Sequence, residues 1–211
     1  MSIAILDYDI GNVRSISEAF KKHGAEVFLT RNKFDILESD GLVIPGVGSF
    51  SHGMKSLSCY GLIEIIKEFS ELNKPILGIC LGMQLLFDES YEYGKTQGLS
   101  LLKGKVIKIP TKNSQSEKLP HVSWNEIYLN EISWNNTILS NIDNGSEMYF
   151  VHSYVAEPED TSQILSITEY SKNKFCSSIK KGNIYGCQFH PEKSGTNGLR
   201  LILNFINICQ L

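Results

Sequence analysis

The chain has 211 residues, of which 42% are hydrophobic and 20% charged, and its formal net charge is −3. This length and composition suit one globular domain and are short for two. The acidic balance offers no basic surface for nucleic acid, and no apolar run reaches the roughly 18 residues of a membrane span. The N-terminal segment 1–7 lacks the basic start and long apolar core of a signal peptide.

Cysteine usage indicates the compartment. The chain has five cysteines, an odd number, and no Cys-x-x-Cys pair. We therefore expect no disulfide framework, no metal site and no cofactor, and we predict a cytoplasmic protein. Four of the cysteines have the context of structural residues: Cys59, Cys176, Cys187 and Cys209.

The first half of the chain alternates strand and helix patterns. Short apolar runs predict strands at 3–6, 27–29, 42–44 and 76–79. Helices are expected at 13–23, around 62–69 and at 81–89. In the middle helix, Leu62, Ile65, Ile66 and Phe69 share one face. Such alternation predicts a parallel sheet that is covered by helices on both faces.

The second half is richer in strands. Patterns typical of strands occupy 106–109, 126–129, 148–151, 164–168, 175–179 and 184–188, with a hairpin turn at 181–183 and a final helix at 197–209. The polar stretch 111–118 is the most linker-like. We predict a single α/β domain over 1–211, an open, mostly parallel sheet flanked by helices with additional antiparallel strands.

The segment Gly78-Ile79-Cys80-Leu81-Gly82 is a cysteine version of the nucleophile elbow. A nucleophile on a sharp strand-to-helix turn has a strained backbone, and flanking glycines leave room for that turn. The following helix supplies N–H groups and a positive dipole end that favour a thiolate. From this pattern alone, a buried structural cysteine is an equally good interpretation.

A catalytic cysteine needs an imidazole partner that is oriented by a third group. His190 ends the apolar run 184–189 and is followed by Pro191 and Glu192. A histidine at a strand end, with a carboxylate two residues on, suits a base and its orienting group. Taken alone, such a pair is more often part of a surface loop.

The two segments together resemble the two catalytic signatures of class I glutamine amidotransferases. Residues 78–84 and 188–192 stand in the expected order, with Cys80 and His190 110 positions apart. Over nearly its whole length the chain resembles the glutaminase subunit of imidazole glycerol phosphate synthase, of the HisH type. The segments that carry this resemblance are 7–12, 45–48, 120–125, 149–154 and 190–194.

The resemblance implies roles for particular residues. Cys80, His190 and Glu192 would be catalytic, and Leu81, Val47 and Gly48 would form the oxyanion hole. The glutamine head group would be held by Gln84, Glu92, His152, Ser153 and Tyr154. The face toward the partner would include Asn12, His121, Trp124, Asn125, Tyr149 and Lys193.

The implied partner is a cyclase subunit with a (βα)₈ barrel, which would receive ammonia and form imidazole glycerol phosphate and AICAR in histidine biosynthesis. Two departures from the pattern bear on that partner. Asp9 replaces a usual glycine, and Val122-Ser123 replaces a usual Met-Gly. An alternative is therefore a paralogue that supplies ammonia to a sugar-amidating enzyme of surface-polysaccharide synthesis. A cysteine hydrolase of another kind and a non-catalytic binding module are two further hypotheses, which the second signature and the complete set of catalytic residue types disfavour.

Overall fold

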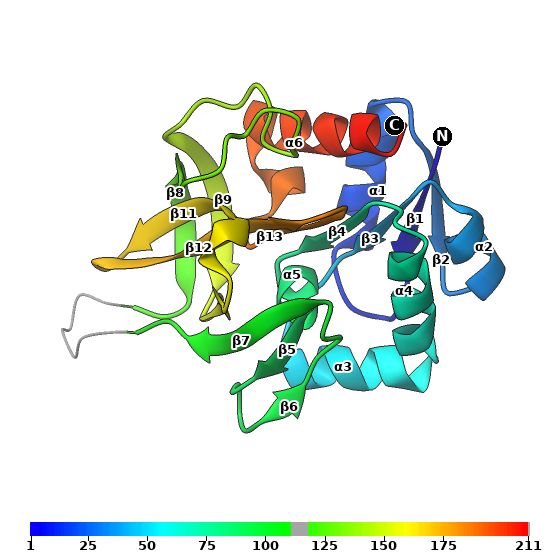
Figure 1. Ribbon diagram of the computed structural model, residues 1–211, viewed down its shortest axis with the longest axis horizontal. Helices are drawn as coiled ribbons and strands as arrows, with labels where there is room; N and C mark the ends of the chain where they lie inside the picture. Colours follow the sequence, from blue (N-terminus) through cyan, green and yellow to red (C-terminus); the bar gives the residue numbers. More distant parts are fainter. Residues whose placement is uncertain (111–117, 211) are drawn as a thin grey trace.

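The computed structural model describes residues 1–110 and 118–210. Two sheets organise the chain, a nine-stranded sheet in the order β2-β1-β3-β4-β13-β12-β11-β8-β9 and a four-stranded sheet in the order β10-β7-β5-β6 (Figure 1). The strands are β1 (Ser2–Leu6), β2 (Glu26–Thr30), β3 (Gly41–Ile44), β4 (Ile76–Ile79), β5 (Phe87–Ser90), β6 (Thr96–Gln97), β7 (Leu102–Lys108), β8 (His121–Leu129), β9 (Ser146–His152), β10 (Tyr154–Pro158), β11 (Ile164–Tyr170), β12 (Asn173–Lys181) and β13 (Ile184–Cys187).

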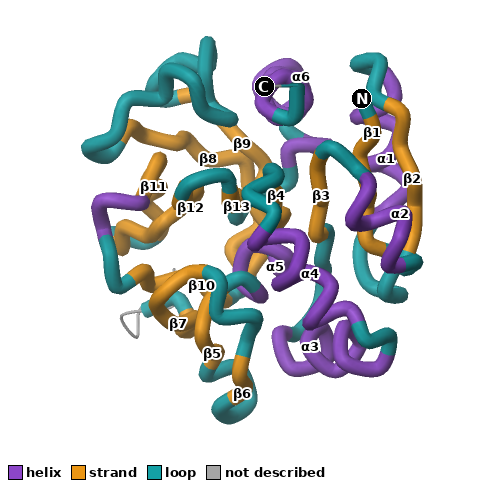
Figure 2. Tube along the Cα trace, turned by 45° about the vertical axis from the view of Figure 1, so that its right-hand side comes forward, coloured by secondary structure: helices purple, strands orange, loops and turns teal. Residues whose placement is uncertain are grey.

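Helices cover both faces of the N-terminal part of the large sheet (Figures 1 and 2). They are α1 (Val13–Lys22), α2 (Lys33–Glu38), α3 (Phe50–Cys59), α4 (Leu62–Glu71), α5 (Leu81–Leu85) and α6 (Gly195–Ile208), with short 3₁₀ turns η1 (Thr161–Gln163) and η2 (Pro191–Lys193). None of the helices in the described residues is long and apolar enough to cross a membrane.

The core divides into two layers because side chains alternate along each strand. In β1, Ile3 and Ile5 pack with α1 and α6, whereas Ala4 and Leu6 pack with α2, α3 and α4. Strands β2, β1, β3, β4 and β13 pair in parallel, and β13, β12, β11, β8 and β9 pair antiparallel. The predicted α/β class with extra antiparallel strands is confirmed.

Several elements differ from the sequence prediction. The helix expected at 81–89 is wrong in its second half, because the chain leaves α5 after Leu85 and forms β5, which pairs with β7 and β6. Helices α2 and α3 were not predicted, although Asn32 caps α2 by accepting hydrogen bonds from the backbone N–H groups of Phe34 and Asp35. The predicted hairpin between β12 and β13 is present. Apart from Lys118, the predicted linker lies outside the described residues.

Candidate active site

Cys80 occupies a strained turn between β4 and α5. Its φ is +54° and its ψ −110°, a conformation that residues with a side chain rarely adopt. The flanking glycines are required sterically. A Cβ on Gly82 would lie 1.8 Å from the carbonyl oxygen of Ile44, and a Cβ on Gly78 would lie 2.7 Å from that of Gly82. The elbow geometry expected from the sequence is therefore formed.

His190 reaches the same end of the sheet through strand pairing. β13 lies parallel to β4, with Gly186 opposite Gly78 and Cys187 opposite Ile79. Because parallel neighbours end at the same edge, the residues that follow them meet there. The Nδ1 of His190 lies 2.9 Å from Oε1 of Glu192, and the two side chains are 3% and 0% exposed.

The charge state of His190 follows from its two neighbours. Burial alone would lower the pKa of this imidazole, but interactions with Cys80 and Glu192 outweigh burial and raise it to about 10. The ring is thus an imidazolium at neutral pH whenever both neighbours are anionic. Within the described residues its Nε2 has no hydrogen-bond partner, which leaves this nitrogen available to a ligand.

A cavity of about 300 Å³ opens beside these residues. It contains Cys80 and His190 together with every residue that the resemblance assigns to the oxyanion hole and the glutamine head group. Its lining is Val47, Gly48, Cys80, Leu81, Gln84, Glu92, Pro120, Val151, His152, Ser153, Tyr154 and His190. Pro120 and Val151 are additions that sequence reasoning missed.

The candidate oxyanion donors differ in rigidity. Leu81 is the first residue of α5, so its N–H has no partner within the helix. Val47 is 44% exposed, and Gly48 has a φ of +100°, which is open to glycine but strained for other residues. One side of the candidate hole is therefore set by the start of a helix, and the other by a loop that follows β3.

The Gln84 side chain is part of the buried wall. Its Nε2 donates hydrogen bonds to the Tyr154 carbonyl oxygen and to Oε1 of Gln188, both at 2.9 Å. The Nε2 of Gln188 in turn lies 3.7 Å from Sγ of Cys80. Gln188 was not among the predicted site residues. Its signal in the sequence is a polar residue within an apolar run, two positions before His190.

Glu92 joins the cavity to α3. Its Oε2 accepts a 2.6 Å hydrogen bond from the N–H of Phe50, the first residue of that helix. The positive end of the helix dipole stabilises a carboxylate in this place. The cavity thus has a carboxyl group in its lining in addition to Cys80 and His190.

The expected contact of His121 with a partner is wrong for its side chain. This residue is 0% exposed, because it points into the protein from β8. Its Nδ1 lies 3.1 Å from Nε2 of His152, its cross-strand neighbour on β9. The neighbours of His121 along β8 are on the outer face instead, with Val122 53% and Trp124 50% exposed.

A cluster of two exposed residues, Trp124 and Lys193, and half-buried Tyr149 lies next to the His190 loop. The Trp124 and Tyr149 rings meet edge to face at 6.1 Å, and Nζ of Lys193 lies 5.7 Å from the centre of the Tyr149 ring. The N–H of His190 donates a 2.9 Å hydrogen bond to the Tyr149 carbonyl. This cluster is therefore one backbone hydrogen bond away from the imidazole.

Asn125 and Asn12, the other two residues predicted on the partner face, are both partly exposed. Asn125 is the next residue along β8, and its side-chain amide donates a hydrogen bond to the Glu169 carbonyl. Asn12 immediately precedes α1.

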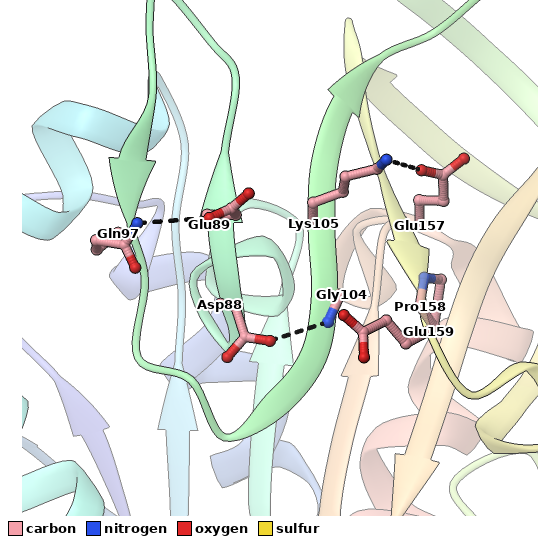
Figure 3. A pocket seen from close by; sticks show the side chains of 8 residues that line it. All are labelled: Asp88, Glu89, Gln97, Gly104, Lys105, Glu157, Pro158 and Glu159. Atoms are coloured by element: carbon pink, nitrogen blue, oxygen red, sulfur yellow. Dashed lines mark hydrogen bonds and ion pairs between the residues drawn. The ribbon is translucent and has the colours of Figure 1, made fainter.

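A larger cavity of about 580 Å³ lies elsewhere, between β5, β7 and the end of β10 (Figure 3). It shares no lining residue with the cavity at Cys80. Its carboxylates are partly neutralised, for example by the 2.9 Å ion pair of Lys105 with Glu157 and the hydrogen bond from Gly104 to Asp88. It holds no thiol or imidazole, so size alone does not identify the reactive site.

Comparisons with known proteins show the family to which the chain belongs. The family model of class-I glutamine amidotransferases matches residues 4–208. The chain is 44% identical over 211 residues to imidazole glycerol phosphate synthase subunit HisH 1 of Legionella pneumophila (strain Lens), covering 98% of this chain and 99% of that protein. It is 43% identical to the HisH subunit of Aquifex aeolicus, covering 97% and 96%.

Solved structures share the fold at low identity. A crystal structure of a glutamine amidotransferase matches with a TM-score of 0.72 at 18% identity, covering 99% of both chains. The glutaminase domain of Trypanosoma brucei CTPS matches with a TM-score of 0.68 at 17% identity, covering 100% of this chain and 94% of that one. The chain belongs to the class I glutamine amidotransferases. Within that class, its relatives at 43–44% identity place it in the HisH family of imidazole glycerol phosphate synthase subunits.

Proposed function

We infer that the chain is the glutaminase subunit of an imidazole glycerol phosphate synthase, hydrolysing glutamine to glutamate and ammonia. The observation that carries this proposal is the strained Cys80 in a cavity shared with a Glu192-bound His190. Membership in the HisH family supports the pathway. The cavity has the size of a small-molecule site, which favours an amino acid over a polypeptide substrate.

In the first half-reaction, the Cys80 thiolate attacks the side-chain amide carbon of glutamine. The N–H of Leu81 and the Val47–Gly48 segment stabilise the resulting oxyanion, a term worth about 10²–10³-fold in rate for one donor. His190 gives its Nε2 proton to the leaving nitrogen, and ammonia departs as the thioester forms. Glu92, which also lines the cavity, binds the α-amino group of the substrate.

In the second half-reaction, His190 changes role. The thioester has removed the negative charge of Cys80, so the interaction that raised the imidazole pKa most is lost. The neutral ring then takes a proton from water, which attacks the thioester and releases glutamate. Glu192 holds the Nδ1 side of the ring throughout.

The ammonia acceptor lies on a partner, which we propose to be a (βα)₈ cyclase subunit that binds over Trp124, Tyr149 and Lys193. Aromatic side chains are enriched at protein interfaces, and Trp124 is 50% exposed. We place the reaction in the cytoplasm. All five cysteines lie within the described residues and are free thiols, as a reducing compartment maintains them.

Partner binding controls the reaction in this proposal. The exposed Val47–Gly48 peptide adopts two orientations, and the partner loaded with acceptor favours the one that completes the oxyanion hole. A gap of about 3–5 kcal/mol between them corresponds to a rate change of roughly 10²–10⁴.

The test is ammonia release from glutamine by the chain alone, with the cyclase subunit, and with the cyclase subunit plus its acceptor. We expect little turnover alone and strong activation by the loaded partner, with Cys80→Ala as the inactive control. Full activity of the isolated chain would refute the gating. Activation by a sugar-amidating enzyme but not by the cyclase would keep the glutaminase and reassign its pathway.

A further inference from the structure

Two buried histidines and a serine form a continuous hydrogen-bonded chain behind the candidate site. We call Ser123, His121 and His152 the relay. The serine Oγ lies 2.8 Å from Nε2 of His121, and Nδ1 of His121 lies 3.1 Å from Nε2 of His152. The Nδ1 of His152 lies 2.9 Å from the Tyr154 carbonyl oxygen. The relay thus runs from partly exposed Ser123 on β8 to the cavity wall.

The Tyr154 carbonyl at the inner end of the relay fixes the tautomers of both histidines and the direction in which the Ser123 hydroxyl donates. A carbonyl oxygen only accepts, so His152 carries its proton on Nδ1 and accepts at Nε2. His121 must then donate from Nδ1, which leaves its Nε2 to accept from the Ser123 hydroxyl. Both rings are neutral in this arrangement. Burial lowers the pKa of His121 to about 4, and burial is also the largest cause that lowers the pKa of His152 to about 3.

Aromatic packing holds the His121 ring in this orientation. Its centroid lies 4.0 Å from the Tyr170 ring at an interplanar angle of 25°, and 5.2 Å from the Phe150 ring at 21°. The His152 ring meets Phe175 at 5.1 Å, edge to face. A ring sandwiched in this way cannot rotate without displacing its neighbours, so the relay is preorganised.

The Tyr154 carbonyl also sets the direction of the hydrogen bonds that lead to Cys80. Because that oxygen accepts, Gln84 must present its NH₂ group to it, and the same NH₂ group donates to Oε1 of Gln188. The amide of Gln188 therefore turns its own NH₂ group toward Cys80 Sγ, at 3.7 Å. An N–H directed at sulfur stabilises its anionic form.

We propose that the relay positions the Tyr154 carbonyl and thereby holds the Gln188 amide against Cys80. The inference rests on the proposed function, because the nucleophile it acts on is the one assigned there. The relay residues are positioning residues, since none of them reaches the sulfur itself. The exposed end of the relay lies on β8 between Val122 and Trp124, the strand that we propose contacts the partner.

The decisive experiment compares His121→Asn with His121→Gln. An asparagine amide takes the place of Nδ1 and can still donate to His152, whereas a glutamine amide extends toward the Nε2 position and loses that donor. We expect Gln to lower kcat about 10- to 30-fold with little change in KM, and Asn to remain within about threefold of wild type. If His121 served only to fill space, His121→Gln should instead keep the higher kcat, because glutamine is closer in volume to histidine than asparagine is.

Two further readouts do not depend on turnover. Ring ¹⁵N spectra of the wild-type chain should show two neutral histidines protonated on Nδ1. Alkylation of Cys80 by iodoacetamide should be slower in His121→Gln than in His121→Asn. Ser123→Ala and Ser123→Thr repeat the test with less risk to folding, because Ser123 is partly exposed. Of the two variants, only threonine keeps the hydroxyl donor.

The outcomes separate the two proposals. A wild-type complex without glutaminase activity would refute the proposed function, while the spectra and alkylation rates would still test the relay. Equal effects of Asn and Gln, an Nε2–H tautomer at either histidine, or equal alkylation in all variants would overturn the relay. If neither His121 variant folds, equal alkylation rates in Ser123→Ala and Ser123→Thr would overturn it.

Discussion

Replacing Glu192 with glutamine removes one charge and leaves the shape of the site nearly unchanged. The carboxylate accepts from His190 Nδ1 at 2.9 Å, and its side chain is fully buried. An amide oxygen can take the same place, so the ring keeps its orientation. The negative charge that stabilises the imidazolium is lost, and the Nε2 proton becomes easier to lose before the leaving nitrogen needs it.

The magnitude follows from the kind of hydrogen bond. A bond to a charged group contributes about 1.5–3 kcal/mol, and an amide retains the smaller, neutral part of it. Since about 1.36 kcal/mol is tenfold in rate, we expect kcat to fall about 10- to 100-fold. His190→Asn, which removes the transferring nitrogen itself, should lose essentially all turnover. The assay is steady-state ammonia release by the complex with its loaded partner.

Glu192→Gln also changes how the free energy of unfolding depends on pH. Because the folded-state pKa of His190 is raised to about 10, its contribution to stability is full below the ordinary value of 6.5 and is lost as pH rises from 6.5 through 10. Removing the carboxylate lowers the pKa of His190, so in Glu192→Gln the stabilisation from this histidine should be lost completely at a lower pH than in wild type. Denaturant unfolding measured from about pH 6 to 10 provides the comparison. A Glu192→Gln enzyme with wild-type turnover and an unchanged stability profile would contradict the orienting role.

Three further changes test other parts of the site. Cys80→Ala should abolish glutamine hydrolysis while keeping the melting temperature, and a glutamine-analogue electrophile should label this cysteine alone of the five. Gly82→Ala should destabilise the fold by at least about 3 kcal/mol in thermal unfolding, because the new Cβ meets the Ile44 carbonyl at 1.8 Å. Gly53→Ala, whose Cβ would meet only leucine side-chain ends at 3.2–3.3 Å, is the milder control. Trp124→Ala should leave the isolated chain folded but weaken partner binding by about 2 kcal/mol, roughly 30-fold in Kd by calorimetric titration.

What the sequence predicts well is local. The elbow at Cys80 is specified by five consecutive residues, and its glycines are needed for close backbone contacts. The local sequence pattern is therefore enough to predict the geometry. The histidine and carboxylate two positions apart are local in the same sense. The parallel strands β3 and β4 are buried on both faces and apolar throughout, so their type can be predicted without knowledge of their neighbours.

What the sequence does not show depends on distant partners. The run through Phe87 continues the apolar pattern of α5, and only pairing with Leu102 and Lys105 on β7 makes it a strand. The sequence predicts His121 on the surface, whereas the register of β8 and β9 places its side chain inside the protein beside His152. The amide chain through Gln188 exists only because two motifs 104 positions apart meet.

The parallel pairing of β4 with β13 also sets an order in time. Cys80 is synthesised 110 residues before His190, and β13 can take its place only after the strands between them have left the ribosome. A nascent or truncated chain that ends before β13 therefore carries a thiol without its imidazole. In the proposed mechanism such a fragment lacks the proton donor for the leaving nitrogen, so we expect glutaminase activity only after β13 has paired with β4.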